Sequence, residues 1–258
     1  MSLLIHMGVQ KTGSTALHHF LQRNRDALAG RVQVLTPVKQ SATRHLGRVA
    51  GLFSLNEATE ADLVAAIRAV RDEINGPDTI LSHENLPGAM PGRGGVVTLF
   101  PRIGEIMALL HRELSMFAPS FAVVTRDMPR WKQSVWGQAV RTDSYARTLP
   151  DFLEETGEVG DWEELATRMR AATSAPVHVL RIEDEADSAR PGAQLLGLLG
   201  LRMDEIQALS PVEGRRNPSL NTGALEFMRL INTLELNPPA RRKVAQLVEK
   251  NQGLFAST

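Results

Sequence analysis

The residues best suited to binding or catalysis lie near the N-terminus, in the segment Gly8–Thr15. This segment supplies one cation and three hydroxyl groups, from Lys11, Thr12, Ser14 and Thr15. The apolar run 3–7 before it indicates a strand, and apolar side chains at helical spacing follow it. At such a strand-to-helix turn, unpaired backbone N–H groups and the positive end of the helix dipole converge. The segment therefore predicts a site for a phosphate-sized anion.

The position of Lys11 separates this segment from the loop that binds nucleoside triphosphates. That loop reads G-x-x-x-x-G-K-[ST], with the lysine directly after the second glycine. Gly8 and Gly13 have the required spacing, but Ser14 occupies the lysine position. The lysine has moved to Lys11, two residues before Gly13. The pattern argues against a standard triphosphate-binding loop.

The pattern K-[ST]-G-[ST]-[ST] after an N-terminal strand resembles that of sulfotransferases that use 3′-phosphoadenosine 5′-phosphosulfate. Bacterial members that begin with a strand similar to Ile5-His6-x-Gly8 are the most similar. The resemblance implies a cofactor-binding loop made of Lys11, Thr12, Gly13, Ser14 and Thr15. It also implies a catalytic role for Lys11, which would stabilise charge on the bridging oxygen as adenosine 3′,5′-bisphosphate leaves.

A second segment with cofactor-binding potential follows the apolar run 121–125, which indicates a buried strand. Asp127 can cap a helix that has Pro129 in its first turn. Ser134 lies eight residues after Arg126, roughly 80° round that helix. A guanidinium and a hydroxyl so placed can bind one phosphate together. Sulfotransferases hold the 3′-phosphate of the cofactor with an arginine and a serine at this spacing, so the resemblance assigns Arg126 and Ser134 that role.

The tip of a third predicted strand, 79–82, carries the candidate general bases. Sulfuryl transfer to a hydroxyl group requires a base within hydrogen-bond reach of the proton that leaves. His83 and Glu84 stand at this tip, and related sulfotransferases place a histidine or a glutamate near it. We favour Glu84 and keep His83 as the alternative.

Three further groups of residues have weaker chemical signals. Val212–Leu220 is a basic loop, and the family closes such a loop over the 3′-phosphate. We select Arg216 as the cofactor-binding residue there and leave the role of Arg215 open. His6 is interpreted as a core or strand-end histidine. His18 and His19 are interpreted as helix-surface residues that form no metal site.

The elements around these residues alternate between strand and helix patterns. Strands are predicted over 3–7, 31–35, 79–82, 121–125 and 177–180, and helices over 14–28, 191–199, 222–236 and 239–250, with two more starting near 59 and 101. Residues 38–58 receive no assignment, and 86–99 and 141–161 are predicted substrate loops. The alternation predicts an α/β fold, a three-layer α/β/α sandwich with a central parallel sheet of about five strands, of the P-loop nucleotide-binding type. We expect one domain over 1–258.

The amino-acid composition limits the classes of partner and of metal site that we expect. Lys plus Arg and Asp plus Glu both count 29, so no global charge favours nucleic acid or an anionic membrane. The absence of cysteine excludes disulfides and thiolate metal sites. Neither a signal peptide nor an apolar run long enough for a membrane span is expected. We therefore expect a cytoplasmic protein.

The resemblance implies a sulfotransferase that moves a sulfuryl group from 3′-phosphoadenosine 5′-phosphosulfate to a hydroxyl or amine acceptor. A carbohydrate, a lipid or a small molecule is the expected acceptor, and no metal is required. A P-loop kinase or NTPase, or a non-catalytic nucleotide-binding protein of the same fold, is the alternative. The sequence leaves the acceptor's identity and the oligomeric state open.

Overall fold

The structure, a computed structural model, describes residues 2–91, 98–157, 159–212 and 220–255. Five short strands run parallel in one sheet, in the order β2-β3-β1-β4-β5. They are β1 (Leu3–Met7), β2 (Val32–Leu35), β3 (Asp78–His83), β4 (Pro119–Thr125) and β5 (Val177–Arg181). Parallel pairing needs crossover connections, which cover the sheet faces.

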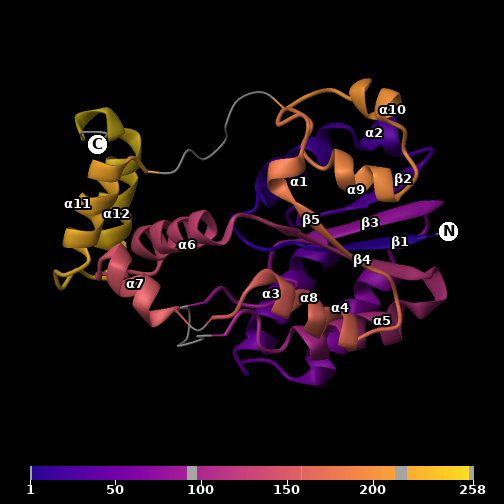
Figure 1. Ribbon diagram of the computed structural model, residues 1–258, viewed down its shortest axis with the longest axis horizontal. Coiled ribbons are helices and arrows are strands. Elements are labelled where there is room, and N and C mark those ends of the chain that lie inside the picture. The colour runs from indigo at the N-terminus through magenta and orange to yellow at the C-terminus, as the bar shows by residue number, and fades with distance from the viewer. Residues whose placement is uncertain (1, 92–97, 158, 213–219, 256–258) are drawn as a thin grey trace.

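Helices lie on both faces of this sheet (Figure 1). One face carries α1 (Ser14–Arg23), α2 (Arg25–Leu28), α9 (Ala193–Leu198) and α10 (Met203–Gln207). The other carries α3 (Ala42–Ser54), α4 (Glu60–Arg71), α5 (Ile103–Leu114) and α8 (Trp162–Ala171). Because alternate side chains of a strand point to opposite faces, Leu4 joins the core beside α1, whereas Leu3 and Ile5 join the core beside α5. The predicted three-layer α/β/α sandwich is confirmed.

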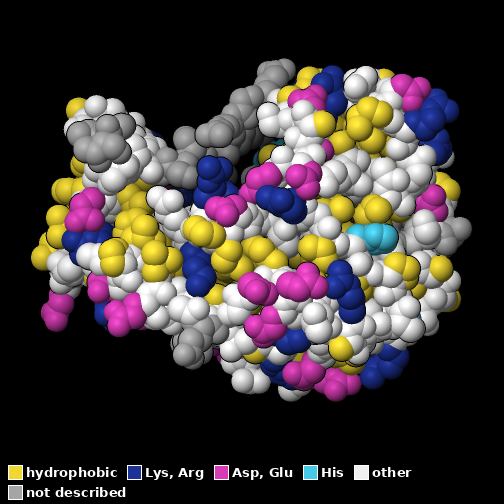
Figure 2. All heavy atoms as spheres, in the orientation of Figure 1, with side chains coloured by type: hydrophobic (Ala, Val, Ile, Leu, Met, Phe, Trp, Pro, Cys, Tyr) yellow, Lys and Arg dark blue, Asp and Glu magenta, His cyan; other side chains and the backbone are white. Residues whose placement is uncertain are grey.

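Four helices extend the fold beyond the carboxyl end of β4 and form what we call the helical lobe. They are α6 (Met128–Thr142), α7 (Leu149–Glu155), α11 (Thr222–Ile231) and α12 (Pro238–Lys250). Val140 of α6 links this helix to α11 and α12. Its carbonyl accepts from Asn232 Nδ2 at the end of α11 and from Arg241 Nη2 of α12. Figure 2 shows apolar side chains on the surface of this lobe, where Phe227 and Leu230 are exposed.

The predicted strands agree with the observed strands to within two residues. The capping box expected near 59 is also present, because Thr59 and Asp62 bond to each other's backbone N–H. Residues 38–58, which received no assignment, contain α3. Gly47 and Gly51 lower the intrinsic helix propensity of α3, so packing rather than local preference holds that helix.

Other helix boundaries depend on long-range contacts. The segment 141–161, predicted as a loop, contains α7. The predicted helix 14–28 is divided in two, because the Asn24 amide donates to the carbonyls of Phe20 and Ser210. The predicted helix 222–236 stops at Ile231 because Asn232 is the C-cap and its amide donates to α6.

Candidate functional site

The loop after β1 exposes backbone N–H groups at the start of α1. Gly13 is the N-cap of α1 in the left-handed region, with φ 89°, and no side chain caps the helix. Lys11 also has a positive φ, 68°, which is uncommon outside glycine. In the described part of the chain, the backbone N–H groups from Lys11 to Ala16 donate to no protein acceptor. These free donors and the helix dipole make an anion site.

The outward carbonyls of the same loop are held by the segment that follows β4. Trp131 Nε1 donates to the Gln10 carbonyl at 2.8 Å, and Arg126 Nη1 donates to the Lys11 carbonyl at 3.3 Å. The N–H and C=O groups of a trans peptide point in opposite directions. Bonding the carbonyls on the outside therefore leaves the N–H groups facing the anion site.

Three positive charges gather at this loop. Burial lowers the pKa of the Lys11 ammonium, and the charges of Arg141 and Arg126 lower it further. Mutual repulsion of this kind is relieved when an anion binds between the groups. Arg141, in the last turn of α6, was not selected from the sequence. Its charge acts on Lys11 only because of the way the chain folds, and Arg141 Nη1 forms an ion pair with Glu249 Oε1 of α12 at 3.5 Å.

The start of α6 has the predicted local structure. The Asp127 side chain accepts from the Arg130 N–H, and Pro129 lies in the first turn. The Arg126 carbonyl accepts from Trp162 Nε1 at 2.6 Å, which fixes this turn. Ser134 lies two turns along α6 and is half-buried. The structure brings Arg126 to the loop Gly8–Thr15, and a joint contact of Arg126 and Ser134 with one phosphate stays a prediction.

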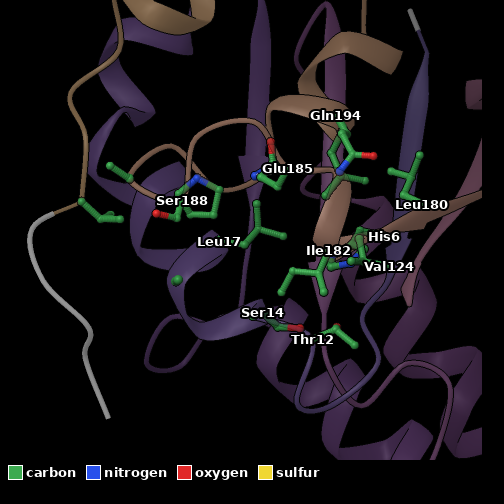
Figure 3. Close-up of a pocket in the computed structure, with 17 residues that line it drawn as sticks. His6, Thr12, Ser14, Leu17, Val124, Leu180, Ile182, Glu185, Ser188 and Gln194 are labelled. Atoms are coloured by element: carbon green, nitrogen blue, oxygen red, sulfur yellow. Dashed lines mark hydrogen bonds between the residues drawn. The ribbon is translucent and has the colours of Figure 1, made fainter. Parts of the chain in front are cut away.

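A pocket of about 540 Å³ opens beside the loop, between α1 and the segment that follows β5 (Figure 3). Its volume falls within the roughly 300–1,000 Å³ usual for ligand sites. Thr12 and Ser14 line it from the loop, His6 from β1, and Glu185 and Gln194 from the segment after β5. No residue of the segment after β5 was selected from the sequence. The rule that ligands bind beyond the carboxyl ends of parallel strands could have found it.

A glycine lets the far wall of this pocket approach α1. Gly192 has φ 97°, and a Cβ atom there would lie 2.3 Å from Leu17 Cδ1. The Gly192 N–H donates to Glu185 Oε2 at 2.8 Å. Burial raises the pKa of Glu185.

The tip of β3 packs directly on Gly8, at the start of the loop Gly8–Thr15. A Cβ atom at Gly8 would lie 2.9 Å from Glu84 Cα, so glycine is required for this approach. The Glu84 side chain is 37% exposed, and its Oε2 lies 3.6 Å from His18 Nδ1 and 3.8 Å from His83 Nδ1. Glu84 is therefore both accessible and adjacent to Lys11's loop.

His83 is less available than Glu84. Its ring is buried, and a Cβ atom at Gly47 of α3 would lie 2.3 Å from the ring. His83 Nδ1 accepts from the Asn85 N–H at 3.0 Å, so this nitrogen is occupied. Burial lowers the pKa of His83. The geometry favours Glu84 of the two candidate bases.

The interpretation of His18 as a surface residue is wrong. Its side chain is 13% exposed, and its Nε2 lies 2.9 Å from Ser82 Oγ. His18 sits on the face of α1 that packs on the sheet, where helical spacing alone did not place it. His6 is buried as interpreted, and its Nδ1 lies 2.7 Å from the same hydroxyl. Arg215 and Arg216 lie outside the described residues.

The architecture matches that of a known enzyme. The chain superimposes on the crystal structure of a sulfotransferase from Alicyclobacillus acidocaldarius with a TM-score of 0.50 and 12% sequence identity. The match covers 94% of this chain and 99% of the other. The chain has the fold of a sulfotransferase. No protein-family model and no curated protein matches the sequence.

Two further findings accompany the sulfotransferase fold. No described helix has both the length and the apolar character needed to cross a bilayer. Within the described ranges, no group of three His, Asp or Glu side chains is arranged to hold a metal ion.

The buried histidines predict acid sensitivity of the fold. Burial lowers the pKa of His6 and of His18 to about 4, and Glu84 only partly offsets this for His18. Unfolded histidine titrates near 6.5, so between about pH 6.5 and 4 the unfolded chain binds more protons than the native protein. The free energy of unfolding should be constant above that window. It should fall within the window by up to about 1.4 kcal/mol per pH unit for each histidine.

Urea denaturation between pH 7.5 and 5 measures this slope. The exposed His45 supplies a control, since His45→Gln should leave the slope unchanged. Equal stability at pH 7.5 and 5 would show that His6 and His18 become charged within the native fold.

Proposed function

We propose that this protein is a sulfotransferase that moves a sulfuryl group from 3′-phosphoadenosine 5′-phosphosulfate to a hydroxyl or amine acceptor. The observation that carries the proposal is the uncapped start of α1, where Lys11 and free N–H groups meet. The sulfotransferase fold and the adjoining pocket support it.

The residues present fit this donor. The loop N–H groups, with Gly13, Ser14 and Thr15, suit its 5′-phosphate, and the 540 Å³ pocket beside them suits its nucleoside. The Thr12 hydroxyl donates to the Val9 carbonyl at 2.6 Å, so Thr12 offers its backbone N–H. Arg126 and Ser134 are proposed to hold its 3′-phosphate, together with Arg216. When bound, the donor supplies a sulfuryl group linked to the 5′-phosphate.

The chain's own groups then have distinct tasks. Glu84 takes the proton from the acceptor as the acceptor oxygen or nitrogen forms its bond to sulfur. The bond between sulfur and the phosphate oxygen breaks, and Lys11 stabilises the charge on that oxygen. Adenosine 3′,5′-bisphosphate leaves with the electron pair. His83 is the alternative base, and the proposed reaction needs no metal. Carbohydrates, lipids and small molecules are the acceptor classes to screen.

The alternative of a P-loop kinase or NTPase has less support. It needs a lysine after the second glycine and a carboxylate for Mg²⁺ at a strand end. Ser14 occupies the first position, and the Asp127 side chain accepts from the α6 backbone. A non-catalytic nucleotide-binding protein would share the loop but not depend on Glu84.

Ligand choice tests the donor. Adenosine 3′,5′-bisphosphate without metal should stabilise the protein by roughly 2.7 kcal/mol at about 100 times its Kd. This corresponds to a rise in Tm of about 5–10 °C for a chain of this size. Thermal unfolding with each nucleotide measures the shift. A larger rise in Tm with ATP plus Mg²⁺ would favour the alternative of a P-loop kinase or NTPase.

The 3′-phosphate contact is tested by Arg126→Ala. Losing a charged hydrogen bond should weaken adenosine 3′,5′-bisphosphate by about 1.5–3 kcal/mol more than adenosine 5′-phosphosulfate, which lacks the 3′-phosphate. Because Arg126 also donates to the Lys11 carbonyl, we expect the affinity for both ligands to fall. The difference between the two losses of affinity measures the contact with the 3′-phosphate. Calorimetry with Arg130→Ala, an exposed arginine in the first turn of α6, is the control. Equal losses for the two ligands would remove Arg126 from the 3′-phosphate site.

The base is tested by Glu84→Gln, once screening with labelled donor has found an acceptor. Turnover should fall by about 10²–10⁴-fold while binding of adenosine 3′,5′-bisphosphate is retained. His83→Ala should cost much less. Glu73→Gln, at an exposed position, is the matched control. Full activity of Glu84→Gln together with loss in His83→Ala would exchange the two roles.

A further inference from the structure

Three buried polar side chains meet beneath the phosphate loop. Ser82 Oγ of β3 lies 2.7 Å from His6 Nδ1 of β1 and 2.9 Å from His18 Nε2 of α1. His6 and Ser82 are almost fully buried, and the His18 side chain is 13% exposed. On its other side, His18 Nδ1 faces Glu84 Oε2 at 3.6 Å. The proposed function assigns no task to His6, Ser82 or His18.

The single hydrogen of the Ser82 hydroxyl determines which groups donate and which accept in this row of hydrogen bonds from His6 through Ser82 to His18. A hydroxyl has one hydrogen and can accept two hydrogen bonds, so at least one of the two ring nitrogens must donate to it. Ser82 Oγ has no other hydrogen-bond partner among the described residues, so its own hydrogen is bonded only if it donates to one ring nitrogen and accepts from the other. If Ser82 donates to His18 Nε2, the hydrogen of neutral His18 is on Nδ1 and points at Glu84. His6 Nδ1 then donates to Ser82, and His6 Nε2 is left as a lone pair.

The opposite direction leaves a conflict at Glu84. Ser82 would donate to His6, and the hydrogen of neutral His18 would be on Nε2, so His18 Nδ1 would turn a lone pair towards the Glu84 carboxylate. His6 Nε2 has no partner among the described residues in either direction, so it does not distinguish them. A buried polar group left without a partner costs about 1–3 kcal/mol. Only the first direction gives Glu84 Oε2 a donor, so the first direction is the stable one.

Glu84 Oε2 matches the donor that the first direction supplies. This oxygen is buried and has no hydrogen-bond partner within the described ranges. Of the two imidazoles that face it, His83 cannot donate from Nδ1, because that nitrogen accepts from the Asn85 N–H. His18 Nδ1–H can. The 3.6 Å separation is long for a hydrogen bond, and such contacts at reactive sites tighten when substrate binds.

We propose that His18 is a positioning residue that holds the inner oxygen of Glu84, while Ser82 and His6 fix the His18 tautomer required for this. With Oε2 held inside, Oε1 is the oxygen that faces an acceptor. The catalytic consequence rests on the proposed function, in which Glu84 is the base. The tautomer and the contact with Glu84 do not.

Nuclear magnetic resonance of protein with ¹⁵N-labelled histidine tests the hydrogen bonds among His6, Ser82, His18 and Glu84 without an activity assay. At pH 7.5, His18 should carry its hydrogen on Nδ1, with Nε2 unprotonated. Ser82→Ala should abolish this tautomer preference, and Glu84→Gln should shift the His18 Nδ1–H signal. Ser210→Ala, a serine outside this row of hydrogen bonds, should change neither signal. A His18 hydrogen on Nε2 in the native protein overturns the proposal.

Kinetics then tests the consequence for turnover. His18→Ala should lower kcat by about tenfold, equivalent to roughly 1.4 kcal/mol, with the KM for acceptor little changed. His18→Asn keeps an N–H near the Nδ1 position and should recover most of that loss, whereas His18→Gln should not. Equal loss in all three variants, or a loss confined to KM, overturns the positioning role.

Failure of the proposed function gives a different result. If no acceptor is ever sulfated while the His18 signals respond as expected to Ser82→Ala and Glu84→Gln, the proposed contact of His18 with Glu84 is supported and the sulfotransferase assignment fails. Should His18→Ala not fold, Ser82→Ala supplies the kinetic test, because it removes the tautomer lock with a smaller change of volume.

Discussion

The site depends on one backbone contact, the approach of Gly8 to the tip of β3. The Gly8 N–H donates to the His83 carbonyl at 3.2 Å, and no Cβ atom could stand at Gly8 without meeting the Glu84 backbone. This contact extends the pairing of β1 with β3 by one residue. It holds the loop Gly8–Thr15 and the candidate base Glu84 in a fixed relation.

The sheet order supplies the rest of the arrangement. Because β1 lies between β3 and β4, the loop that carries Lys11 lies between Glu84 on one side and Arg126 on the other. Both neighbours also hold the loop itself. Gln10 donates to Asn85 Oδ1 and to the Gly88 carbonyl beyond β3, and Trp131 donates to the Gln10 carbonyl from α6. These bonds hold the loop Gly8–Thr15 in place, and a preorganised loop loses less conformational entropy when it binds a ligand.

Several features of the site oppose the stability of the free protein. Lys11 has a left-handed backbone, α1 begins without a side-chain cap, and like charges surround the Lys11 ammonium. Side chains cap several other helices, as Ser41 and Asp161 do for α3 and α8, although α5 and α9 also begin without one. Unfavourable local features concentrated at one spot are typical of a ligand-binding site, where the ligand supplies the missing interactions.

The sequence by itself determined the strands, the turn between β1 and α1 and the capped start of α6, because each depends on neighbours within one or two turns. Apolar runs, the position of Lys11, and Asp127 with Pro129 are all local signals. Tertiary structure alone decided the burial of His18, the pocket beside Gly192 and the approach of Arg141 to Lys11. Helical spacing shows which side chains share a face, but what packs on that face is set by strand order and crossovers. These join residues far apart in the chain, such as His18 and Ser82, whose contact no local pattern records.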